Sequence, residues 1–104
     1  MATDLNKLMN DILNANNEAF MFSEVNDGGA SNFDAPIVKI KLSKEEKEYM
    51  CDFLQPIGER GYRDCYYVDV TLLGQGNRRT TMARAAARYL KAAGYEASVR
   101  NMVD

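Results

Sequence analysis

Hydrophobic positions recur at two different spacings along this chain, and the change of spacing separates predicted helices from predicted strands. Residues 4–15 carry apolar side chains at helical spacing, with Thr3 or Asp4 as the N-cap. A second helical pattern covers residues 78–93, and Gly94 follows it in the place of a left-handed C-terminal cap. Two amphipathic helices are therefore expected, one at each end of the chain.

A third helix is predicted between them from its start signal. Ser43 and Glu46 have the spacing of a capping box, in which each side chain binds the backbone N–H group of the other residue. We expect this helix to run to about Leu54, with Pro56 ending it. The residues expected to be buried are Tyr49, Met50, Phe53 and Leu54.

Alternation of apolar and polar residues predicts strands in the remaining segments. The second strand shows it most clearly, because Val38, Ile40 and Leu42 alternate with Lys39 and Lys41. The predicted strands are residues 19–25, 37–42, 65–73 and 95–103, and residues 26–36 form a flexible loop that is rich in glycine, asparagine and aspartate.

These elements predict a single α+β domain over residues 1–104, in the order α-β-β-α-β-α-β. One hairpin and two β-α-β crossovers would give a mixed four-stranded sheet. The helices are expected mainly on one face, with the second and third helices covering it. The first helix would then pack at the end of the sheet or on the other face.

Composition restricts the function classes. The chain has 104 residues, 46% of them hydrophobic and 27% charged, with a net charge of −2. We expect a small soluble cytoplasmic protein, since no signal peptide or apolar membrane span is evident. With two cysteines and no histidine, the sequence predicts no zinc site, no cofactor and no histidine-dependent catalytic group, and it favours reduced thiols. We expect no enzymatic activity.

The third helix carries the strongest hint of a ligand. A turn with two glycines precedes it, and five cations lie between residues 78 and 91 without an acidic residue among them. Helix N-termini and cationic side chains both attract anions, which makes a nucleic-acid backbone the first candidate ligand. The predicted binding residues are Gly74, Gly76, Asn77, Arg78, Arg79, Arg84, Arg88 and Lys91.

Other interpretations of this charge remain open. The acidic face of the second helix could neutralise the basic helix, which would make both an ordinary solvated surface. The two glycines could serve backbone geometry, with Asn77 or Thr80 as a plain N-cap. A polar sheet face could stack bases in the manner of RNA-recognition modules, unless the first helix or a second subunit covers it. The residues expected on that face are Lys39, Lys41, Tyr67, Ser98 and Arg100.

A second function hypothesis is that of a small protein-interaction protein, such as an assembly subunit or an inhibitor of a larger enzyme. Tyrosine and arginine are favoured at protein interfaces, and both are concentrated in residues 60–67. A homodimer is compatible with either hypothesis. The residues assigned to this alternative are Arg60, Tyr62, Arg63, Tyr66 and Tyr67, together with Glu45, Glu48 and Asp52 of the acidic helix.

Overall fold

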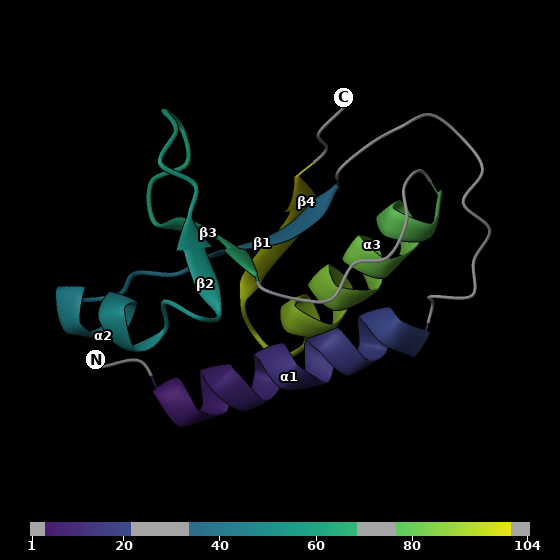
Figure 1. Cartoon of the computed structure of the whole chain (residues 1–104), viewed down its shortest axis with the longest axis horizontal. Helices are drawn as coiled ribbons and strands as arrows, with labels where there is room; N and C mark the ends of the chain where they lie inside the picture. The colour runs from purple at the N-terminus through teal and green to yellow at the C-terminus, as the bar shows by residue number, and fades with distance from the viewer. Residues whose placement is uncertain (1–3, 22–33, 69–76, 101–104) are drawn as a thin grey trace.

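Over the residues that the structure describes, the protein is an α+β fold of three helices and a four-stranded antiparallel sheet (Figure 1). The computed structural model describes residues 4–21, 34–68 and 77–100, with only the backbone of residues 77–79. The predicted fold class is confirmed. Its elements are α1 (Leu5–Met21), β1 (Ala35–Lys39), α2 (Lys44–Tyr49), β2 (Leu54–Pro56), β3 (Cys65–Val68), α3 (Asn77–Ala92) and β4 (Glu96–Arg100).

Helix α1 begins as predicted and continues further than predicted. The Asp4 carboxylate accepts a hydrogen bond from the backbone N–H of Lys7 at 3.1 Å, so Asp4 is the N-cap. The helix continues to Met21, which makes the first part of the strand predicted over residues 19–25 wrong. The remainder of that segment, like most of the loop predicted over residues 26–36, lies outside the described residues.

A stripe of small and large apolar residues explains the length of α1. Alanines continue the buried row after the larger side chains end, and they allow close approach of a second helix. Phe20, within the segment predicted as a strand, is exposed and contributes nothing to the core. The buried row consists of Leu8, Ile12, Ala15 and Ala19.

Helix α2 has the predicted start and an earlier end. The Ser43 hydroxyl accepts from the Glu46 backbone N–H at 3.2 Å, and the Glu46 carboxylate accepts from the Ser43 backbone N–H at 2.9 Å. The capping box is therefore confirmed. The helix ends at Tyr49, because the chain turns at Met50 and enters strand β2 at Leu54.

This early end changes the burial of α2. Met50 and Leu54 are buried and Phe53 is partly buried, as predicted. Tyr49 is 58% exposed, and its predicted burial is wrong because the six-residue helix directs it to solvent. Pro56 is accommodated because β2 is an edge strand, where a missing N–H donor costs least.

The strand order is β2-β3-β1-β4, and every described pairing is antiparallel. The predicted mixed sheet is thus wrong. A crossover was expected between β1 and β3, but β2 and β3 form a hairpin, and β3 pairs antiparallel with β1. Strands β3 and β4 run in the same direction with α3 between them in sequence. That crossover was predicted, but the antiparallel strand β1 lies between its two strands.

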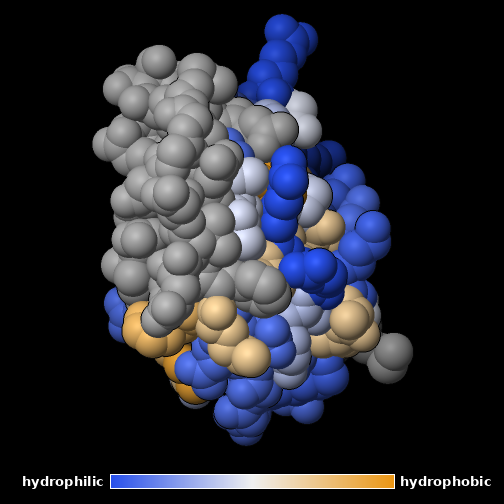
Figure 2. Space-filling view, turned by 90° about the vertical axis from the view of Figure 1, so that its right-hand side faces the viewer, coloured by the Kyte–Doolittle hydropathy of each residue, from blue (hydrophilic) through white to orange (hydrophobic). Residues whose placement is uncertain are grey.

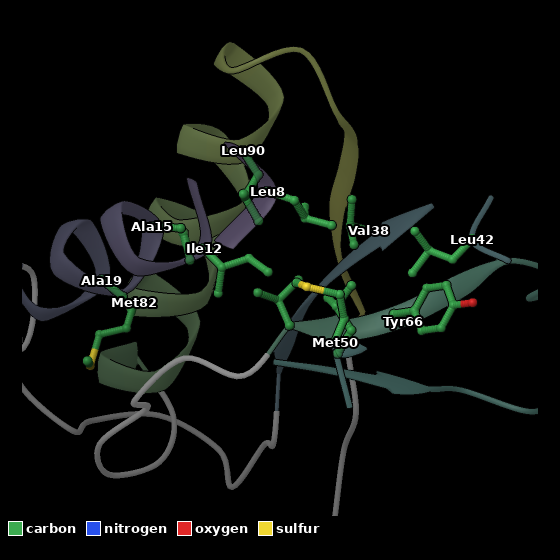
Figure 3. Close-up of a cluster of buried hydrophobic side chains, with 13 residues drawn as sticks. Leu8, Ile12, Ala15, Ala19, Val38, Leu42, Met50, Tyr66, Met82 and Leu90 are labelled. Atoms are coloured by element: carbon green, nitrogen blue, oxygen red, sulfur yellow. The ribbon is translucent and has the colours of Figure 1, made fainter. Parts of the chain in front are cut away.

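Helices α1 and α3 pack against each other on one face of the sheet, while α2 lies at one end of the molecule (Figures 1 and 3). Helices mainly on one face are confirmed, but α1 occupies the place predicted for the second helix. Its buried stripe is longer and more apolar than that of α2, which has no fully buried residue. The core side chains that join these elements are Leu8, Ile12, Val38, Tyr66, Met82 and Leu90.

Candidate functional site

Helix α3 divides sharply into a buried face and a charged outer face. Small apolar residues allow it to lie close against α1 and the sheet. Arg84, Arg88 and Lys91 lie outside this stripe and are all exposed. The helical spacing predicted this division. The buried residues of α3 are Met82, Ala83, Ala85, Ala86, Ala87 and Leu90.

The three cations form a continuous row that we call the α3 basic face, defined by Arg84, Arg88 and Lys91. Their spacing of four and three residues places them on one side of the helix over about 10 Å. No acidic residue occurs within α3. Figure 2 views the molecule from the end where α3 begins, and hydrophilic residues cover much of the described surface there.

The acidic helix does not neutralise this face. Glu45, Glu48 and Asp52 are exposed, but they lie on and just after α2, which does not pack against α3 (Figure 1). The two helices are separated along the long axis of the molecule. The interpretation in which the two charged helices face each other is therefore wrong.

The N-terminal end of α3 is described in part. Gly74 and Gly76 lie outside the described residues, while Asn77, Arg78 and Arg79 form the beginning of α3 with their side chains outside the description. The ligand-binding role of each of these five residues remains a prediction. Thr80 is not the N-cap, because the helix has already begun at Asn77.

A buried acid lies beside this first turn and was missed by sequence reasoning. Asp34 is 4% exposed, and its carboxylate accepts a hydrogen bond from the Thr80 hydroxyl at 2.8 Å. A carboxylate is favourable near the positive end of a helix. It also repels a second anion at the same place. Only the three-dimensional fold brings Asp34 next to Thr80, 46 residues away in sequence.

The polar face of the sheet contains a cluster around Arg100. Its guanidinium lies 2.6 Å from Glu59, donates a hydrogen bond to the Tyr67 hydroxyl, and lies 4.7 Å from the ring centre of Tyr62. The hydrogen bond from Arg100 lowers the pKa of Glu59, and the same bond raises the pKa of Arg100. We call Glu59, Tyr62, Tyr67 and Arg100 the Arg100 cluster.

This cluster decides between two interpretations of the polar face. Register places Lys39, Tyr67, Ser98 and Arg100 on the same face, as predicted, whereas Lys41 lies beyond the end of β1. No described helix covers this face, since α1 packs with α3 on the other one. Tyr67 and Arg100 are nevertheless engaged with each other and with Glu59. Their contacts join β3 and β4 to the loop before β3, which is a structural role.

The tyrosine and arginine residues of 60–67 separate into three environments. Arg60 and Arg63 are exposed, while Tyr62 and Tyr67 are half-buried against Arg100. Tyr66 is 3% exposed, and its side chain lies in the core. It alternates with Tyr67 along β3 and therefore points to the helical face. Burial is the main reason why the pKa of Tyr66 is raised.

A pocket of about 230 Å³ opens beside α2. Its floor is apolar and includes the ring of Tyr66, whereas its rim carries the side chains of α2 and of the turn that follows. Cys51 at this rim is an exposed free thiol, and Cys65 is a half-buried one. The lining residues are Leu42, Lys47, Glu48, Met50, Cys51, Leu54, Gln55, Pro56 and Tyr66.

Two findings apply to the described residues alone. Within residues 4–21, 34–68 and 77–100, no group of three or more cysteine, aspartate or glutamate residues is placed to hold a metal ion. None of the helices in these ranges is long and apolar enough to cross a membrane.

Comparison of the chain with protein-family models, curated proteins and solved structures finds no match.

Proposed function

We propose that this protein is a small non-catalytic binding module that holds a nucleic-acid backbone against the α3 basic face. One observation carries the proposal: Arg84, Arg88 and Lys91 are exposed in a row on a helix without acidic residues. The net charge of −2 gives no general attraction to nucleic acid, so a local surface of this kind has to provide it.

Phosphate contacts along the outer face fit the surroundings of α3 better than a phosphate at its N-terminal end. Asp34 already places a carboxylate beside the first turn, next to Thr80. Arg78 and Arg79 would extend the contact toward that turn. The predicted cations of α3 thus all belong to the proposed surface.

The test is fluorescence anisotropy with labelled single-stranded RNA and duplex DNA. Three phosphate contacts predict that affinity falls about 20- to 40-fold between 50 and 200 mM salt. The variant Arg84→Gln/Arg88→Gln/Lys91→Gln should lose this binding and its salt dependence. We expect the loss for RNA and DNA alike, because backbone contacts carry no sequence information.

A matched control separates a local surface from net charge. Lys41, Lys44 and Lys47 are exposed cations outside α3, and replacing all three with glutamine changes the net charge by the same amount. This control should bind like the wild type. Equal loss of binding in both variants, or unchanged binding in the α3 variant, would contradict the proposal.

A second candidate function has its own observation. The pocket beside α2 has an apolar floor, and acidic Glu48 and the exposed Cys51 lie at its rim. Its volume of about 230 Å³ suits one large apolar side chain of a protein partner. We propose this pocket as the anchor point of the alternative function, that of a protein-interaction subunit or inhibitor.

NMR titration with toluene and indole, which are analogues of phenylalanine and tryptophan side chains, tests the pocket. We expect saturable shifts at Leu42, Met50 and Leu54 in the wild type. The variant Cys51→Trp should fill the mouth of the pocket and abolish these shifts, while Cys51→Ser should retain them. Shifts that survive Cys51→Trp, or no shifts in the wild type, would exclude the pocket as an anchor.

A further inference from the structure

We infer that the outer edge of β4 is a self-association surface on which a second copy of this chain pairs antiparallel, centred on Ser98. This inference is independent of the proposed function. The two edges of the sheet differ in how well they can pair with another strand.

Strand β2 forms one edge and is poorly suited to further pairing. It has three residues, and one of them is Pro56, which lacks a backbone donor. Short length and proline are the usual protections of an edge strand. Strand β4 forms the other edge with five residues and no proline, and among the described residues it pairs only with β1. Within the described ranges, the outward backbone donors and acceptors of alternate β4 residues face no other strand.

The sequence of β4 is complementary to itself when the second copy runs antiparallel. Glu96 and Arg100 lie two residues before and after Ser98, on the same face of the sheet. Pairing centred on Ser98 therefore places Glu96 of each copy opposite Arg100 of the other, which gives two charge pairs. A parallel arrangement in register would place Glu96 opposite Glu96, which is repulsive.

Within its own chain, the Arg100 side chain reaches across β1 to Tyr67 of β3 and to Glu59, away from the outer edge of β4. To pair with Glu96 of the second copy, this side chain has to turn toward the outer edge and exchange its contact with Glu59 for one with Glu96. A shift of one residue would exchange the two faces of the strand and lose both charge pairs. The register is thus fixed by charge.

The resulting dimer has one continuous sheet, with its two-fold axis perpendicular to that sheet. Because α3 packs against β4 and β1, this axis places both copies of α3 on the same face of the dimer. The α3 basic face would then occur twice on one side.

Cysteine cross-linking tests the register. With Cys51→Ser and Cys65→Ser as background, Ser98→Cys would place two thiols directly opposite each other, with Cα atoms about 4.5–5.5 Å apart. Air oxidation should then give an interchain disulfide. Ala97→Cys is the matched control, since Ala97 would face Val99 of the second copy. Its Cα atoms would lie about 8 Å apart, too far for a disulfide.

Sedimentation velocity of the protein without nucleic acid tests the charge pairs. We expect a concentration-dependent monomer–dimer equilibrium that Glu96→Lys weakens about tenfold or more, because two attractive pairs become repulsive. Glu45→Lys, the same change on exposed α2, should leave it unchanged. A wild type that stays monomeric at about 1 mM, or equal cross-linking at Ser98 and Ala97, would overturn the inference.

Discussion

At the residue scale, three polar side chains fasten the start of α1 to the end of α3. The Lys7 ammonium lies 2.8 Å from the Asp11 carboxylate, which also accepts a hydrogen bond from the Tyr95 hydroxyl at 2.7 Å. Lys7 additionally donates to the backbone carbonyl of Ala93 at 3.4 Å and lies over the ring of Tyr95. The contact joins residues more than 80 positions apart in sequence.

This contact predicts an acid-dependent loss of stability. Burial raises the pKa of Asp11, but the hydrogen bonds from Lys7 and Tyr95 outweigh it, so the pKa lies below its ordinary value of 3.8. A lowered carboxylate pKa stabilises the fold above about pH 4, and this stabilisation is lost as the pH falls through the lowered value. Asp11→Asn should lower the free energy of unfolding by about 1–3 kcal/mol at pH 7.

Urea unfolding at pH 7 and pH 3 measures both parts of this prediction. The difference between wild type and Asp11→Asn should shrink at pH 3, because this pH lies below the ordinary carboxyl pKa of 3.8 and the unfolded wild type then takes up the proton. Asp52→Asn, at an exposed position after α2, serves as the control. Its free energy of unfolding should equal that of the wild type at both pH values. A difference of the same size at both values would show that the Asp11 charge contributes nothing.

At the scale of single elements, signals carried by neighbouring residues predicted the structure well. The capping box of Ser43 and Glu46 is formed, and Gly94 adopts a φ of +107° after α3, a conformation that favours glycine. The division of α3 into a buried stripe and exposed cations is also correct. Each of these three features depends on residues within one or two helical turns of each other, so it can be predicted from the local sequence.

Elements whose form depends on distant partners were not predictable. Strand β2 has three residues with a proline, and its identity comes from pairing with β3. The last turn of α1 is helical because Ala15 and Ala19 bury against the core. The same limit applies to the sites. The exposure of Arg84 followed from helical spacing, whereas the contacts of Glu59 with Arg100 and of Asp34 with Thr80 required the fold.

At the scale of the whole molecule, α1 connects the parts of the fold. It packs against α3, and its buried stripe joins the core that also contains Val38 of β1 and Tyr66 of β3 (Figure 3). Helix, sheet and crossover therefore share one set of buried side chains. A fold with one shared core is expected to unfold in a single cooperative transition.

Two neighbouring residues of α1 make this expectation measurable. Ile12 is 1% exposed within the core and Leu13 is 50% exposed, although both are apolar and differ little in size. Ile12→Ala should lower the free energy of unfolding by about 2–5 kcal/mol, and Leu13→Ala by no more than about 0.5 kcal/mol. The first loss is a large fraction of the 5–15 kcal/mol that typically holds a domain together.

Helical circular dichroism and near-ultraviolet tyrosine signals, followed in one urea titration, should show coincident transitions for both variants. Separate transitions in Ile12→Ala would mean that α1 detaches before the sheet unfolds, and that α1 and the sheet do not share one cooperative core.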